Sequence, residues 1–105
     1  MSDNLFKVLT KENIISVLET HKSEFIKFGV RDVGLFGSYL RNEQSDISDI
    51  DLLIDFEPSK ESFDNYMAVY DLLEKTFPNQ KVEVITKNGL SPHIGPKILK
   101  DVMYV

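Results

Sequence analysis

The sequence predicts an α/β (α+β) domain in which helices flank a small mixed β-sheet. Segments with apolar residues at helical spacing alternate with short, strand-like apolar runs, in the order α-β-α-β-α-β-α. The chain has 105 residues, which is enough for one hydrophobic core but leaves little for a second. Its 42% hydrophobic and 28% charged residues are typical of folded globular domains. We therefore interpret residues 1–105 as a single domain.

The first helix is predicted from Thr10, a residue suited to a helix N-cap, to Phe28, with Gly29 ending it. One stripe of this helix holds its apolar residues and one histidine: Ile14, Leu18, His21, Phe25 and Phe28. A short buried strand then covers residues 31–36, the run RDVGLF.

The turn at Gly37 and Ser38 joins this strand to a short predicted helix in residues 38–42, the run SYLRN. Glycine lets the backbone approach a ligand closely, serine offers a hydroxyl, and a helix start presents free N–H groups. The turn therefore suits an anion such as a triphosphate. An ordinary turn with serine as the cap is the alternative, because Gly-Ser alone is a weak signal.

The run from Asp49 to Phe56 alternates with period two, which predicts a strand with one apolar face. The apolar face holds Ile50, Leu52, Ile54 and Phe56. The other face is predicted to be acidic and holds Asp49, Asp51, Leu53 and Asp55. Asp55 lies beside Glu57 at the end of the strand, where a solvated carboxylate that protects a sheet edge is the expected role.

Three more elements complete the predicted order. A helix begins near Phe63 and ends at Pro78, with its apolar stripe formed by Phe63, Tyr66, Tyr70, Leu73 and Phe77. A strand follows in residues 81–86, KVEVIT, and a loop leads to a last helix. The stripe of that helix is predicted to hold Ile98, Leu99, Val102 and Met103. The apolar ending VMYV would anchor this helix or form part of an interface.

Asp49 and Asp51 project side by side and repel each other unless a cation lies between them. Oxygen ligands of this kind suit Mg²⁺ or Mn²⁺, which take their remaining ligands from water and phosphates. The chain has no cysteine and no histidine near these residues, which removes the usual zinc ligands. We therefore predict a divalent metal that binds a phosphate compound, with a merely solvated face as the alternative.

The bulk charge excludes some functions. The chain has 12 Lys and Arg against 17 Asp and Glu, a formal charge of -5, which argues against direct binding of nucleic acid. It has no run of the roughly 20 apolar residues that span a bilayer, and its start lacks the features of a signal peptide. Together with the absence of cysteine, this predicts a cytoplasmic protein without membrane contact.

Gly37 and Ser38, ten further residues, and then Asp49-Ile50-Asp51 match the signature of the DNA polymerase beta-like nucleotidyltransferase superfamily. The string GSYLRNEQSDISDIDLLIDF resembles the smallest branch, the minimal nucleotidyltransferases, in which an arginine, here Arg41, follows the Gly-Ser pair. The closing LSPHIGPKILKDVMYV is similar to the C-terminal segment of that branch. The resemblance covers the chain from about residue 12 and implies the polymerase beta-like nucleotidyltransferase fold.

The resemblance also implies the site. Two Mg²⁺ ions would be held by Asp49, Asp51 and a third acidic residue from a later strand, by position Glu83, where the family more often has aspartate. A charged residue on an edge strand is the alternative for Glu83. Gly37, Ser38 and Arg41 would bind the triphosphate of ATP. For Arg41 the alternative is an ion pair with a nearby acid, Glu43 or Asp46.

Minimal nucleotidyltransferases are commonly encoded beside a HEPN-domain ribonuclease toxin. The resemblance implies that this chain is the antitoxin of such a pair and transfers AMP from ATP to a tyrosine hydroxyl of the toxin. Two alternatives remain: an antitoxin that neutralises the toxin by binding alone, and a small-molecule nucleotidyltransferase. The latter enzymes carry an additional substrate domain, for which this chain has no room.

Overall fold

The computed structural model describes residues 9–45 and 47–105. Its centre is a four-stranded sheet with the strand order β3-β2-β1-β4. The strands are β1 (Val30–Phe36), β2 (Ile50–Phe56), β3 (Val82–Thr86) and β4 (Met103–Tyr104). β1 is antiparallel to both β2 and β4, whereas β2 and β3 are parallel. The predicted mixed sheet is therefore confirmed.

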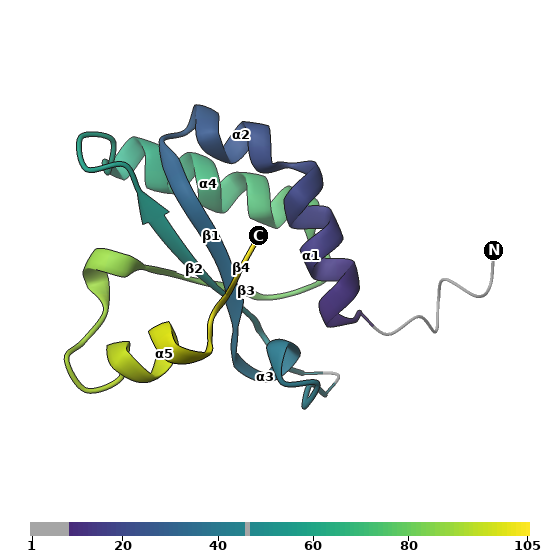
Figure 1. Ribbon diagram of the computed structural model, residues 1–105. Coiled ribbons are helices and arrows are strands. Elements are labelled where there is room, and N and C mark those ends of the chain that lie inside the picture. Colours follow the sequence, from purple (N-terminus) through teal and green to yellow (C-terminus); the bar gives the residue numbers. More distant parts are fainter. Residues whose placement is uncertain (1–8, 46) are drawn as a thin grey trace.

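Helices lie on the sheet as predicted. They are α1 (Lys11–Thr20), α2 (Lys22–Lys27), α3 (Gly37–Leu40), α4 (Phe63–Thr76) and α5 (Gly95–Asp101), with a short 3₁₀ turn, η2 (Lys87–Gly89), after β3. Figure 1 shows α1, α2 and α4 grouped together and α5 apart from them across the strands. The core lies between the first group and the sheet, where Leu18, Leu52 and Leu73 are fully buried. No helix in the described ranges is long and apolar enough to cross a membrane.

The first helix is interrupted, which corrects the prediction of one helix from Thr10 to Phe28. Thr10 does cap α1, because its hydroxyl accepts a hydrogen bond from the amide of Asn13 at 3.1 Å. His21 leaves the helical region, with φ −98° and ψ 10°, and its ring contacts Glu24 at 2.7 Å. It therefore ends α1 and precedes α2. Gly29 ends α2 with φ +85°, as predicted.

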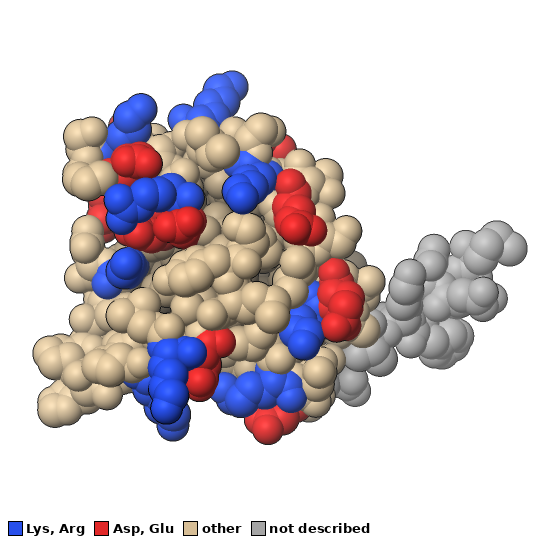
Figure 2. All heavy atoms as spheres, in the orientation of Figure 1, with Lys and Arg blue, Asp and Glu red and all other residues tan. Residues whose placement is uncertain are grey.

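The chain ends in a strand, which corrects the prediction that Val102 and Met103 continue the last helix. α5 ends at Asp101, and β4 then pairs with β1 through Leu35 opposite Met103. Gly34 permits this approach, because a Cβ atom on Gly34 would overlap the side chain of Val102. The ending VMYV is thus anchored by sheet pairing. Figure 2 shows that the centre of this face, where β4 crosses β1 in Figure 1, is uncharged.

The second face of β2 is buried at Leu53 and Asp55, which corrects the prediction that Asp55 is a solvated carboxylate at a sheet edge. Leu53 is fully buried and Asp55 is only 6% exposed. Because β2 lies between β1 and β3, Asp55 has no sheet edge to protect. Instead its Oδ2 accepts a hydrogen bond from Nη2 of Arg31 at 2.8 Å, and Nζ of Lys87 lies 3.9 Å away. Asp55 is therefore part of a structural ion pair.

Candidate functional site

The junction between β1 and α3 lies directly against Asp51. The last residue of β1, Phe36, is the sheet partner of Asp51, so Gly37 follows at the same level of the sheet. Gly37 has φ +79°, in the left-handed region that favours glycine. A Cβ atom at this position would overlap the carboxylate of Asp51 and would lie 2.9 Å from its Cγ. Only glycine fits here without displacing that carboxylate.

Three carboxylates lie near one another beside this junction. Asp51 of β2 and Glu83 of β3 are direct partners in the parallel register, so their side chains leave the same face of the sheet. Asp49 lies two residues before Asp51, and its Oδ2 is 3.9 Å from Nζ of Lys81. The three acidic residues that were predicted from the sequence therefore lie at the same part of the β2–β3 pair, and the charges of Asp49 and Glu83 act on Asp51.

The pKa of the Asp51 carboxyl is shifted by burial and by its acidic neighbours. Its pKa is raised from 3.8 to about 6. Burial of the carboxylate is the largest cause, and the charges of Glu83 and Asp49 raise the pKa further, whereas the guanidinium of Arg41 lowers it. Burial and the neighbouring carboxylates therefore both disfavour the charged form of Asp51, and a bound cation would relieve the repulsion among the carboxylates.

The donor set fits a hard divalent ion, because it consists of carboxylate oxygens without sulfur or imidazole. The side chains are nevertheless not arranged as a finished metal site. Within residues 9–45 and 47–105, no three Asp, Glu, His or Cys side chains are gathered closely enough to hold an ion as they stand. The Glu83 side chain is exposed and can rotate. Binding would therefore require the carboxylates to turn towards a common point.

Arg41 forms the ion pair that was the alternative to its predicted role at the triphosphate. Its Nε donates to Oε1 of Glu43 at 3.0 Å, and both side chains are at least half exposed. Asp46, the other predicted partner, lies outside the described residues. At the same time Arg41 is close enough to Asp51 to lower the pKa of that carboxylate. An exposed ion pair of this kind contributes little to stability, so the guanidinium remains available to an anion.

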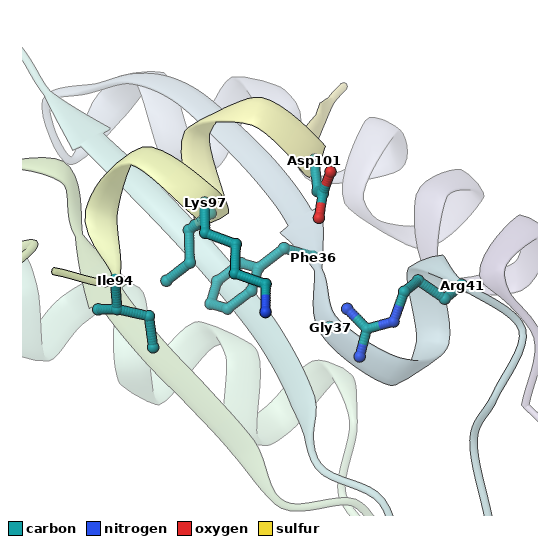
Figure 3. Close-up of a pocket in the computed structure, with 7 residues that line it drawn as sticks. Phe36, Gly37, Arg41, Ile94, Lys97 and Asp101 are labelled. Atoms are coloured by element: carbon teal, nitrogen blue, oxygen red, sulfur yellow. The ribbon is translucent and has the colours of Figure 1, made fainter.

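A cavity of about 200 Å³ opens beside Gly37 and extends the site beyond the residues predicted from the sequence. Figure 3 shows it between the β1–α3 junction and α5. Its lining consists of Phe36, Gly37, Arg41, Ile94, Lys97, Ile98 and Asp101. The four residues contributed by α5 and the turn before it were not predicted as site residues from the sequence. Their spacing of three, one and three residues is itself a helical stripe, which is the signal that would have revealed them.

Comparison with known proteins assigns the class. The polymerase beta nucleotidyltransferase family matches residues 12–104. The chain therefore belongs to this family and is a nucleotidyltransferase.

The relatives are more specific. Protein adenylyltransferase MntA of Thermococcus cleftensis is 38% identical over 99 residues, which cover 93% of this chain and 98% of the relative. A candidate protein adenylyltransferase of Methanocaldococcus jannaschii is 40% identical over 103 residues, which cover 91% and 98%. The predicted resemblance is thus confirmed across nearly the whole of both relatives.

Two solved structures agree with the fold. A candidate minimal nucleotidyltransferase superposes with a TM-score of 0.78 at 25% identity, covering 90% of this chain and 95% of the other. A toxin–antitoxin crystal structure with AMP-PNP has a TM-score of 0.61 at 18% identity and covers 91% and 72%. At that identity the second match shows the fold alone.

Proposed function

We propose that this protein transfers AMP from ATP to a tyrosine hydroxyl of a HEPN-domain toxin encoded by a neighbouring gene, and that it thereby acts as the antitoxin. The observation that carries the proposal is the left-handed Gly37 held against Asp51, beside Glu83 on the next strand. The relatives named protein adenylyltransferase support the donor and the kind of acceptor. The toxin–antitoxin structures of the same fold support the kind of partner.

Asp49, Asp51 and Glu83 are the proposed ligands of Mg²⁺, with two ions in the complete site. When bound, the ions would neutralise charge on the phosphates and lower the pKa of the attacking hydroxyl. Before binding, the three carboxylates supply only negative charge, so they would repel the triphosphate. Productive binding of ATP is therefore expected to depend on the metal.

The residues of the β1–α3 junction are the proposed contacts of the triphosphate. Gly37 lets the backbone approach a phosphate without a side chain in between, and Ser38 offers a hydroxyl. Arg41 supplies a positive charge that compensates the carboxylates. These three residues would hold the α-phosphate in line with the acceptor.

The proposed reaction is an in-line displacement. The tyrosine oxygen forms a bond to the α-phosphorus, the bond from that phosphorus to the bridging oxygen breaks, and pyrophosphate leaves. The hydroxyl proton passes to a carboxylate, for which the exposed Glu83 is available, or to water.

Intact-mass measurement of the toxin tests this proposal. The toxin is incubated with this protein, ATP and Mg²⁺, and in parallel with the Asp51→Asn variant. We expect one or more additions of AMP mass to the toxin, which disappear with the variant. An unmodified toxin in both reactions would refute protein adenylylation.

Neutralisation by binding alone is the second candidate function. It is favoured by the exposed Glu83 in place of the family's usual aspartate and by carboxylates that are not gathered around one point. An unmodified toxin that still forms a stable, inactive complex with the Asp51→Asn variant would support it.

We also propose that residues 1–105 form one domain that works in the cytoplasm. The single core that joins α1, α2 and α4 to the sheet supports the first statement. The absence of cysteine and the need for ATP support the second. Recovery of the native protein in a soluble cell fraction together with its toxin tests the location.

A further inference from the structure

The cavity beside Gly37 has walls from two parts of the chain that are distant in sequence. One wall is the β1–α3 junction, which belongs to the proposed triphosphate site, and the other is α5. α5 packs outside the main core, with Ile98 as its buried anchor at 7% exposure. The helix therefore forms the cavity without being part of the carboxylate cluster.

Two cations face this cavity from opposite sides. Figure 3 shows Lys97 of α5 and Arg41 of the β1–α3 junction extending into the same hollow next to Gly37. In the described residues Lys97 has no ion-pair partner within 4.0 Å. Arg41 has an exposed ion pair with Glu43, and Asp101 lines the hollow, but neither occupies the space between the two cations, where an anion would be attracted by both.

The rest of the lining is largely apolar. Phe36 and Ile98 form its inner part, and Ile94 stands at the rim with 54% of its surface exposed. An exposed isoleucine next to an aromatic ring can pack on a flat heterocycle. A cavity of about 200 Å³ is smaller than the roughly 300 Å³ that encloses a whole drug-sized ligand, so it would hold only part of a nucleotide.

We propose that α5 completes the nucleotide site, with the base against Phe36 and Ile94 and with Lys97 as a second phosphate-binding cation opposite Arg41. This inference rests on the proposed function for the identity of the nucleotide, ATP. It adds residues of the C-terminal helix to the site and makes Lys97 a direct contact of the phosphates. The phosphates leave the cavity past Gly37, which leads them to Asp51.

Asp101 supplies an internal test of this arrangement. It lies one turn after Lys97 and lines the same hollow with the opposite charge. A carboxylate there lowers the affinity for a triphosphate, whereas the lysine raises it. Neutralising Lys97 should therefore lower the affinity for the triphosphate, and neutralising Asp101 should raise it. Loss of packing alone would not change the affinity in opposite directions.

Equilibrium binding of a fluorescent, ribose-labelled ATP analogue in the presence of Mg²⁺ tests the inference. We expect Lys97→Gln to weaken binding about tenfold, as for the loss of one charge-assisted contact. Asp101→Asn should tighten binding about threefold by removing one repulsive charge. Lys100→Gln is the matched control, because Lys100 lies on the same helix and outside the cavity lining, and it should leave the affinity unchanged.

Competition with adenosine distinguishes the contribution of the base to binding from that of the phosphates. Ile94→Ser should raise the inhibition constant of adenosine. Lys97→Gln should leave that constant unchanged, because adenosine carries no phosphate. If Lys97→Gln and Lys100→Gln change the affinity for the ATP analogue equally, the inference is wrong. If adenosine binds Ile94→Ser as tightly as it binds the wild type, the placement of the base is wrong.

The transfer reaction distinguishes this inference from the proposed function. If the wild type modifies the toxin, Lys97→Gln should raise KM for ATP about tenfold with kcat nearly unchanged. An unchanged KM would refute the role of α5 alone. If the wild type transfers no AMP while the binding series behaves as expected, the proposed function fails and the nucleotide cavity stands.

Discussion

Gly37 and Asp51 lie so close together that a single methyl group on Gly37 would take the place of the Asp51 carboxylate. The glycine also adopts φ +79°, which L-residues with a Cβ atom adopt only with strain. The closest approach between the proposed triphosphate site and the proposed metal ligands is therefore made by a backbone without a side chain.

Gly37→Ala is predicted to abolish transfer. The left-handed backbone costs about 1–2 kcal/mol for a residue with a Cβ atom, and the displaced carboxylate of Asp51 no longer meets the substrate. Activity and thermal unfolding of the variant should be measured together, so that loss of function is not confused with loss of fold.

Gly29→Ala is the matched control for this change. Gly29 has φ +85°, and a Cβ atom there would lie 2.6 Å from Cβ of Lys60, far in the fold from the carboxylates. We expect a similar loss of stability but near-normal transfer below the melting temperature. Equal activity of the two alanine variants would contradict the importance of the contact between Gly37 and Asp51.

Asp51→Asn is predicted to stabilise the metal-free protein at pH 8. The pKa of Asp51 in the folded protein, about 6, exceeds its ordinary value of 3.8, so the folded state binds the proton more tightly. The stability that this group contributes is therefore complete below about pH 4 and is lost as the pH rises through 6. In EDTA the variant should melt a few degrees above the wild type at pH 8, and this difference should shrink at pH 5.

Asp55→Asn should have the opposite effect on stability. Asp55 lies on the same face of β2 as Asp51, but its buried carboxylate accepts a 2.8 Å hydrogen bond from Arg31. The neutral amide loses the charge that holds Arg31 and Lys87, so the melting temperature should fall by several degrees at pH 8. Transfer should continue below that temperature. A variant that melts like the wild type would show that this ion pair is not structural.

Mg²⁺ is predicted to stabilise the wild type and to leave Asp51→Asn nearly unchanged. Burial is the largest cause of the raised pKa of Asp51, and repulsion by Glu83 and Asp49 adds to it. A cation between the carboxylates neutralises that repulsion, and the proton competes with the metal for the same oxygens. The metal-induced rise in melting temperature should therefore decrease as the pH is lowered through 6. Chelation with EDTA should remove both this stabilisation and the transfer activity.

Glu83→Gln is predicted to lower kcat by more than about 100-fold, because several kcal/mol of charge stabilisation is lost with one metal ligand. Glu83→Asp keeps the charge and should retain much of the activity. Because Glu83 is exposed, neither variant should change the melting temperature of the metal-free protein strongly. Full activity of Glu83→Gln would leave Asp49 and Asp51 as the only necessary carboxylates.

The periodic patterns of the sequence predicted those helices and strands whose apolar residues recur at regular spacing. Alternation in residues 49–56 located β2, and the apolar stripe before Pro78 located α4. The break at His21 and the strand β4 were missed for different reasons. The first is a change of backbone angles at one residue, His21, within an otherwise continuous apolar stripe. The second depends on a partner strand about 70 residues earlier that offers Gly34. Neither feature changes the periodic spacing of apolar residues in the sequence.

The candidate site likewise has some residues that were predicted from the sequence and others that only the folded chain reveals. The resemblance carried by the Gly37-Ser38 and Asp49-Ile50-Asp51 motifs implied that these residues share a site, and the structure places Gly37 against Asp51. The register of β2 with β3 places Glu83 beside Asp51. Asp55 continues the same alternation but is buried by the neighbouring strands, which its position in the period does not reveal. Lys97 joins the site only because α5 folds back towards the β1–α3 junction.

ATP labelled separately on its α-phosphate and on its γ-phosphate tests the central claim most directly. Each labelled nucleotide is incubated with this protein, the toxin and Mg²⁺, and the label bound to the toxin is counted. Nucleotidyl transfer predicts that the α-label enters the toxin, that the γ-label leaves as pyrophosphate, and that Asp51→Asn abolishes the incorporation. Incorporation of the γ-label, or of no label by the wild type, would contradict it.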